Sequence, residues 1–137
     1  MERAHGDPEE IVRALLLGHL SLDGLPVDEA LIAGPPQQGQ TYSPYYIEIA
    51  GGGGLADYFE QSPVVDIDVY APTRARAKMV ASAVQMVLLC YPWSVGLGSG
   101  EHYVIDSVTC DIAPRKMPWD DESIRRQGAQ YTLSLRR

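Results

Sequence analysis

The fold is decided by the stretch Val64-Val65-Asp66-Ile67-Asp68-Val69-Tyr70. Successive side chains of a β-strand point to opposite faces of the sheet, and apolar and acidic side chains alternate here. Val65, Ile67 and Val69 therefore share one face. Asp66 and Asp68 share the other face. The pattern predicts a strand that packs one face into a core and turns the other towards water.

Two helices are predicted, one before and one after this strand. The first runs from Asp7 to Leu20, because Asp7 can accept hydrogen bonds from the unpaired backbone amides of a first turn. The second follows the turn Ala71-Pro72-Thr73, is capped by the threonine, and runs from Arg74 to Tyr91. Apolar residues at helical spacing predict the buried stripe of this second helix: Ala75, Met79, Ala83, Met86, Val87 and Cys90.

Four further extended segments are predicted, at residues 30–33, 45–49, 103–113 and 124–136. The run Gly51 to Gly54 is expected to break regular structure and to open a mobile loop that ends near Ser62. Gly128 is expected to mark a bulge or a bend. Apolar side chains at alternating positions predict the inward or interface residues of the last two segments: Val104, Val108, Cys110, Ile112, Tyr131, Leu133 and Leu135.

These elements predict an α+β domain that spans residues 1–137. We expect a small, mostly antiparallel sheet with two helices packed on one side, in the order α-β-β-β-α-β-β. The composition, 45% hydrophobic and 21% charged, is typical of a globular protein. The apolar stretches are far shorter than the ~20 residues of a membrane-spanning helix, and the polar N-terminus does not resemble a secretory signal. We therefore expect no membrane partner and assembly in the cytoplasm.

Catalytic and cofactor motifs are absent from the sequence. The three histidines are isolated and no Cys-x-x-Cys pair occurs, so a zinc site is not expected. The glycine runs 51–54 and 96–100 lack the ending of a phosphate-binding loop, and no Gly-x-Ser-x-Gly motif occurs. Cys90 and Cys110 are interpreted as reduced, buried thiols. The sequence thus predicts a protein that is not an enzyme and holds no cofactor or metal.

One constellation leaves a catalytic alternative open. Asp66 and Asp68 could hold Mg²⁺ or Ca²⁺ through carboxylate oxygens, which would suit a small metal-dependent enzyme. A solvated strand face is the interpretation we favour, because the outward positions of a half-exposed sheet are usually polar. The net charge of −7 does not indicate a surface that grips DNA phosphates. For the tyrosines at 42, 45 and 46 we expect a role in packing or in an interface.

The end of the chain predicts contact between subunits. A compact domain of this size is about 37 Å across. A final strand over residues 124–136 would span roughly 43 Å at ~3.3 Å per residue, so its overhang would present unpaired backbone groups. A bent hairpin with a frayed end is the alternative. The preceding loop, residues 114–123, combines Met117 and Trp119 with charges of both signs, as protein interfaces commonly do.

Basic side chains crowd the first turn of the second helix, where the helix dipole disfavours them. They are Arg74, Arg76 and Lys78. We expect acidic partners nearby, and Asp120, Asp121 and Glu122 of the same or a neighbouring subunit are the candidates. A solvated helix start that is screened by salt is the alternative interpretation.

Taken together, these features resemble the tail terminator, or head-tail joining, family of long-tailed phages. The resemblance rests on the helix Asp7 to Leu20, the strand 63–70, the turn 71–73 into a long helix, and a Pro-rich charged loop before the strand that ends Tyr131-Thr132-Leu133-Ser134-Leu135-Arg136. It covers most of the chain and depends on residue types more than on a fixed signature.

The resemblance implies a virion protein that assembles as a hexameric ring, ends the tail tube and docks to the head connector. DNA would pass through the ring without specific binding, along a lumen that Asp66 and Asp68 could line. The implied subunit interface includes Arg115, Lys116, Met117, Trp119, Asp120, Asp121, Glu122 and Arg125, beside the basic helix start. A head-closure or neck adaptor protein is the alternative within the virion.

Overall fold

The computed structural model describes residues 7–22, 24–36, 42–56, 60–118 and 123–136. Its elements, in chain order, are α1 (Pro8–His19), a 3-10 turn η1 (Glu29–Leu31), β1 (Ile32–Ala33), β2 (Tyr46–Ala56), β3 (Glu60–Ala71), α2 (Arg74–Leu89), β4 (Trp93–Gly96), β5 (His102–Met117) and β6 (Arg125–Arg136). Asp7 and Thr73 cap the two helices, each through a side-chain oxygen that accepts a backbone N–H. The predicted N-terminal caps of both helices are therefore confirmed.

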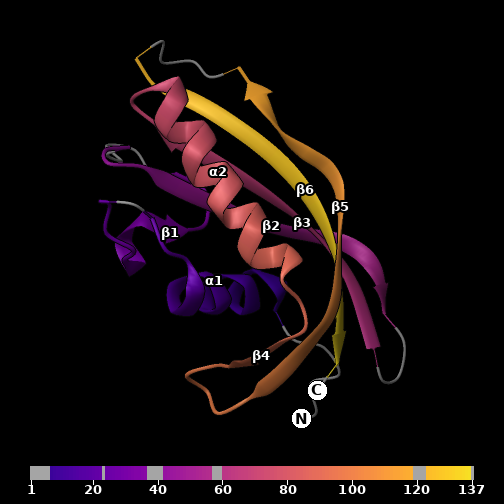
Figure 1. The fold of residues 1–137 in the computed structure, drawn as a ribbon. Coiled ribbons are helices and arrows are strands. Elements are labelled where there is room, and N and C mark those ends of the chain that lie inside the picture. The colour runs from indigo at the N-terminus through magenta and orange to yellow at the C-terminus, as the bar shows by residue number, and fades with distance from the viewer. Residues whose placement is uncertain (1–6, 23, 37–41, 57–59, 119–122, 137) are drawn as a thin grey trace.

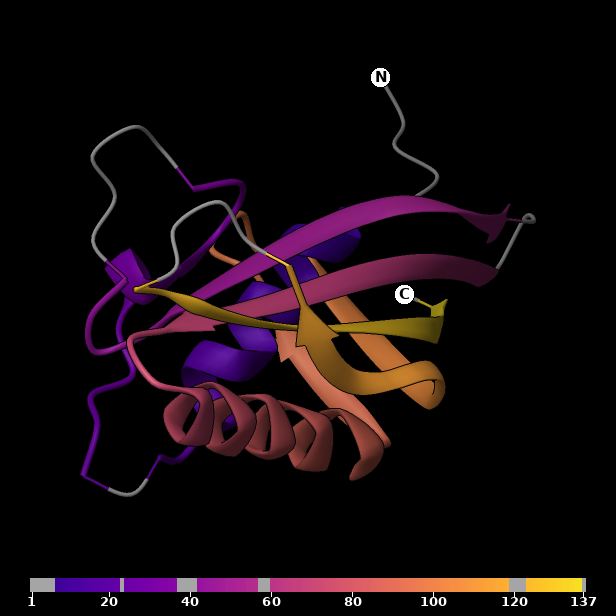
Figure 2. The same ribbon diagram turned by 90° about the horizontal axis from the view of Figure 1, so that it is seen from above.

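All six strands form one sheet in the order β1-β2-β3-β6-β5-β4. The sheet is strongly curved and both helices lie on its concave side (Figure 1). Viewed from above, the end formed by β4 and β5 bends round towards the helices (Figure 2). α1 packs on β2 and β4, and α2 packs on β3, β5 and β6. The convex side of the sheet remains without a helix over the described residues.

The predicted fold class is wrong in its sheet and in its element order. The sheet is large and mixed, because β1 pairs parallel to β2 and β5 alone has 16 residues. The order also contains a strand that was not predicted, β4, which ends where the glycine run 96–100 begins. β4 has four residues, too few for alternation to be visible, yet Val95 in it is buried. Trp93 ties it to α2 by donating from Nε1 to the carbonyl oxygen of Val87 at 2.8 Å.

The glycine run Gly51 to Gly54 is also not the loop that we predicted. β2 continues through it and pairs with β3, with one register shift between Gly52 and Gly54. Glycine is unfavourable in a strand because it has no side chain to pack, but backbone pairing with a long neighbour can hold it there. The Cβ of any other residue at 51 would meet Pro8 Cγ at 3.0 Å and Glu9 Cγ at 3.1 Å. Glycine therefore lets the start of α1 approach the backbone of β2.

The buried face of α2 differs from the prediction. Its buried residues are Ala77, Val80, Ala81, Val84 and Leu88. In the predicted stripe, Ala83 and Val87 are half-buried, whereas the other four residues, Ala75, Met79, Met86 and Cys90, are exposed. Apolar residues recur at helical spacing on both sides of α2, and periodicity alone cannot decide which side meets the sheet. The prediction of a buried Cys90 thiol is thus also wrong, and Cys110 is half-buried.

β6 lies in the middle of the sheet, so the predicted overhang of the final strand is wrong. Its neighbours β3 and β5 are as long as it is, or longer, and pair along its length. Gly128 marks no bulge between β3 and β6, whose register is constant there, but it pairs with Arg115 at the end of a register shift between β5 and β6, so the predicted irregularity lies in β5. A Cβ at Gly128 would lie 2.6 Å from Asp68 Oδ1 and 2.8 Å from Met117 Cγ. The side chains that cross over this position therefore explain the glycine.

The irregular strand is β5. Its register against β6 shifts between Ile105 and Ser107 and twice more before Arg115. Because each bulge changes which side chains face the core, the simple alternation predicted for residues 103–113 is wrong at Val104, which is half-buried, and at Ile112, which is 37% exposed. Buried positions in this segment include Tyr103, Ile105 and Val108. The prediction for β6 is confirmed, since Tyr131, Leu133 and Leu135 are buried.

Candidate assembly surface

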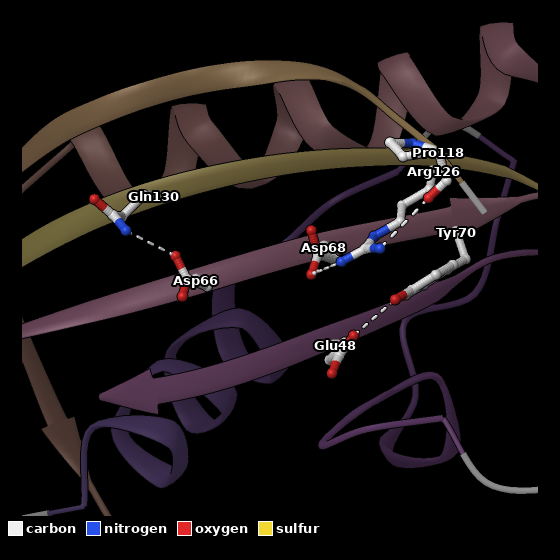
Figure 3. Close-up of polar contacts among 7 residues, drawn as sticks. All are labelled: Glu48, Asp66, Asp68, Tyr70, Pro118, Arg126 and Gln130. Atoms are coloured by element: carbon white, nitrogen blue, oxygen red, sulfur yellow. Dashed lines mark hydrogen bonds and ion pairs between the residues drawn. The ribbon is translucent and has the colours of Figure 1, made fainter. Parts of the chain in front are cut away.

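The convex face of the sheet carries a layer of paired polar side chains (Figure 3). Strand alternation brings Asp66, Asp68 and Tyr70 of β3 to this face. Gln130 of β6 donates from Nε2 to Asp66 Oδ1 at 3.1 Å. The hydroxyl of Tyr70 donates to Glu48 Oε1 at 2.7 Å. The outward placement predicted for the two aspartates is confirmed, and hydrogen bonds between neighbouring strands hold the side chains in place.

Arg126 is the centre of this polar layer. Its Nη2 donates to Asp68 Oδ2 at 2.9 Å, and the two side chains are only 23% and 15% exposed. Its guanidinium lies 5.6 Å from the centre of the Tyr70 ring, within the range of a cation–π contact. Burial alone would lower the pKa of Arg126, but the hydrogen bond and the negative charge of Asp68 raise it above its ordinary value. The arginine therefore stays charged, and its ion pair with Asp68 links β6 to β3.

Three tyrosines pack together at the end of this layer. The ring of Tyr42 lies 5.3 Å from that of Tyr70 and 6.3 Å from that of Tyr46. Burial and the charge of Glu48 raise the pKa of Tyr46. Tyr45 points elsewhere: its hydroxyl donates to the carbonyl oxygen of Pro26 at 2.6 Å, and burial followed by the charge of Asp28 raises its pKa to about 12. Tyr45 and Tyr46 are both buried, which confirms a role in packing.

A divalent metal has no support in this geometry. Asp66 is engaged by Gln130, and Asp68 is neutralised by Arg126. Across the described ranges, no group of three or more histidine, cysteine, aspartate or glutamate side chains is placed to hold a metal ion. Hard cations prefer six or more oxygen ligands, a number that two occupied carboxylates on one strand do not approach. The pair is better explained as part of a polar sheet face.

A cleft of about 780 Å³ lies between the start of α2 and the arm formed by β5 and β6. Four of the predicted interface residues line it: Arg74, Lys116, Met117 and Arg125. A neighbouring groove of about 310 Å³ on the polar sheet face is lined by Arg115 together with Met117, Asp66 and Asp68. Arg74 thus meets residues that follow it by 42 to 51 positions in the sequence. The cleft is basic, and an acidic, partly apolar surface would complement it.

The other predicted interface residues are placed differently. Arg76 donates from Nη1 to the carbonyl oxygen of Pro44 at 3.4 Å, so it serves the fold of its own subunit. Lys78 is exposed on α2. Trp119 and the acidic residues Asp120, Asp121 and Glu122 lie outside the described residues. The contact that we predicted between these acids and the helix start therefore stays a prediction.

Both edges of the sheet are open in part. β4 covers β5 only at residues 102–105, and among the described residues no strand pairs with its outer edge from 106 to 117. This edge contains register shifts, Pro114 and Lys116, and such features disfavour pairing with a strand of another chain. β1 covers β2 only at Ile47 and Glu48, and farther along the N–H of Gly51 donates to Glu9 Oε2 at 2.9 Å. Neither edge is a simple template for a partner strand.

The exposed face of α2 is the surface that sequence reasoning missed. Met79 is 37%, Met86 69% and Leu89 41% exposed, and Tyr91 just beyond is 43% exposed. The signal was present in the sequence as the stripe that we assigned to the core. A helix that is apolar on two sides is usually covered on both. This outer face is therefore unusual for a helix at the surface.

The fold is similar to that of a chain in the virion of a native gene transfer agent particle. The two chains share 14% sequence identity with a TM-score of 0.55. The match covers 93% of this chain and 85% of that chain. No protein-family model matches the sequence, and no curated protein does. At this identity the likeness establishes a shared fold. Within the described residues, no helix is both long and apolar enough to cross a membrane.

Proposed function

We propose that this chain is a structural protein of a tailed, phage-like virion, and that its copies form a hexameric ring that ends the tail tube and joins it to the head connector. The observation that carries the proposal is the similarity, over 93% of the chain, to a chain of a gene transfer agent virion. That likeness supports a role in a virion, and the narrower position at the tail end rests on the sequence resemblance described above.

The arrangement of surfaces supports assembly with other subunits. The cleft at the β5–β6 arm gathers Arg74, Lys116, Met117 and Arg125, a mixture of cations and an apolar side chain that suits a protein interface. The proposal assigns the chain no catalytic role and no cofactor. DNA would pass through the ring without specific binding, along a lumen that Asp66 and Asp68 would line; the carboxylate of Asp66 would repel phosphate, whereas the charge of Asp68 is balanced by Arg126.

The test removes the protein from assembling particles. If it ends the tube, particles that lack it should show filled heads separate from tails of irregular, excessive length. Heads that lose their DNA beside tails of normal length would instead indicate the head-closure or neck position. Particles of normal appearance and infectivity or transfer activity would refute a virion role. Electron microscopy of the lysates distinguishes the three outcomes.

A further inference from the structure

The exposed face of α2 carries two methionines and a leucine that the subunit itself does not bury. Ala75, Met79, Ser82, Met86 and Leu89 follow one another at alternating spacings of four and three residues, the pattern of a helical packing seam. Met86 is 69% exposed, the most exposed large apolar side chain in the described residues. The core of the subunit does not need this face, because α2 already buries Ala77, Val80, Ala81, Val84 and Leu88 against the sheet.

The charge of α2 indicates what covers this face. The helix carries three basic residues, Arg74, Arg76 and Lys78, and no acidic one. Because the whole chain has 11 basic and 18 acidic residues, the remainder carries 8 basic and 18 acidic, a net charge of −10. A second copy of the same chain is therefore acidic outside its α2, opposite in sign to the basic start of this helix. Opposite charges at the rim of an apolar patch favour one partner orientation over others.

The charges of α2 and the proposed ring together argue against contact between two α2 helices. All three cations lie within the first five residues of α2, so they would face each other only in a parallel pair of helices. Like charges placed opposite one another across an interface are unfavourable. The parallel pair is therefore disfavoured, and in the proposed ring each α2 meets a different surface of the next copy. A contact between two different surfaces of identical subunits is heterologous, and heterologous contacts generate rings when their rotation closes.

We propose that the outer face of α2, from Ala75 to Leu89, is the core of the contact between copies and docks on an acidic surface of the next copy outside its α2. This inference rests on the proposed ring and names the surface that closes it. The contact continues into the cleft at the start of α2, where Lys116 and Met117 add to its rim. The sixteen-residue helix is about 24 Å long, so a stripe about 10 Å wide along it covers roughly 240 Å². A stable interface buries ~800 Å² per partner, so the contact needs the surface of the cleft as well.

The first experiment compares the Met86→Glu variant with a matched control, Gly98→Glu. Gly98 is exposed, has open space around it and has no left-handed backbone, so this control adds the same charge away from α2. Light scattering after size-exclusion chromatography gives the mass of the full chain over a range of concentrations. Met86→Glu should raise the concentration needed for half-assembly at least about tenfold, because a carboxylate is costly at a buried contact. Its melting temperature should equal that of the wild type at concentrations where both are monomeric. Gly98→Glu should assemble like the wild type.

The second experiment identifies the acceptor. An equal mixture of ¹⁴N- and ¹⁵N-labelled protein is cross-linked from the exposed thiol of Cys90, at the end of α2, and mass spectrometry separates links within one copy from links between copies. Links between copies should join α2 to residues outside α2. Mainly α2–α2 links, or Met86→Glu rings of wild-type mass and stability, overturn this inference and leave the ring intact. A wild-type chain that stays monomeric both alone and with tail tubes overturns the inference and the ring together.

Discussion

Replacement of Arg126 by alanine should destabilise the fold by about 2 kcal/mol, a figure that follows from two contacts on the convex sheet face and from the entropy of the arginine side chain. The side chains of Arg126 and Asp68 are only 23% and 15% exposed. The charged hydrogen bond between them contributes roughly 1.5–3 kcal/mol. The cation–π contact with Tyr70 adds about 0.5–1 kcal/mol. Alanine loses no side-chain conformational entropy on folding, whereas an ordered arginine does, and this difference offsets up to about 1.5–2 kcal/mol of the loss.

The assay is urea unfolding of the variants Arg126→Ala, Asp68→Ala and the double variant, together with thermal unfolding. For a chain of this length, a loss of 2 kcal/mol lowers the melting temperature by roughly 5–10 °C. The coupling free energy between the two sites should be about 1 kcal/mol or more. Arg115→Ala, which removes an exposed arginine that lines the groove on the same face, is the control and should cost less than about 0.5 kcal/mol.

The result that refutes this reasoning is a coupling free energy near zero, or equal losses for Arg126→Ala and Arg115→Ala. Either would mean that the pair between β3 and β6 is as weak as an ordinary surface salt bridge, which is typically worth less than about 1 kcal/mol. The polar layer would then have no part in joining the two central strands.

Three further predictions concern stability. Within the described residues the buried hydroxyl of Tyr131 lacks a hydrogen-bond partner, so Tyr131→Phe should stabilise the chain by about 1 kcal/mol in urea unfolding, and a loss would show that the hydroxyl is satisfied. Gly128→Val should cost roughly 2 kcal/mol or more, because even a Cβ there meets Asp68 Oδ1 at 2.6 Å; a neutral result contradicts the packing described. Burial raises the pKa of Tyr45 to about 12, so its contribution to stability is complete below the ordinary value near 10 and is lost as the pH rises through 12. Melting temperatures should therefore fall over this range, less steeply in Tyr45→Phe, and parallel curves for the two proteins would contradict the assignment.

The sequence predicted those elements whose local pattern agrees with their tertiary environment. In β3, apolar and acidic residues alternate, and the structure buries Val65, Ile67 and Val69. The helix starts at Asp7 and Thr73 were visible because a cap depends on a few adjacent residues. Local chemistry was sufficient at these places.

Predictions failed where partners distant in the sequence decide the outcome. The glycine run in β2 predicts a loop from its local sequence, but it forms a strand because it pairs with β3. β4 is too short to show a period. In α2 the apolar periodicity was recognised, but only packing against β3, β5 and β6 selects the face that is buried. The same ambiguity concealed the exposed stripe of Met79 and Met86, the surface on which our inference about assembly depends.

The placement of the candidate site residues was predicted in part. The position of Arg74 beside Lys116, Met117 and Arg125 requires the β5–β6 arm to return over the start of α2, which no local pattern encodes. Mixed charge beside Met117 in residues 114–123 was nevertheless a usable signal for this end of the molecule, although β5 continues through the first four of these residues. The partners of Asp66 and Asp68, in contrast, follow only from the register between β3 and β6.

Negative-stain electron microscopy of the purified chain, with and without isolated tail tubes, tests the central claim most directly. The account predicts closed rings of uniform diameter that sit at one end of each tube, whether or not the rings exist before the tubes are added. Tubes whose ends stay bare, beside protein particles no larger than a single 15.0 kDa chain, would contradict it.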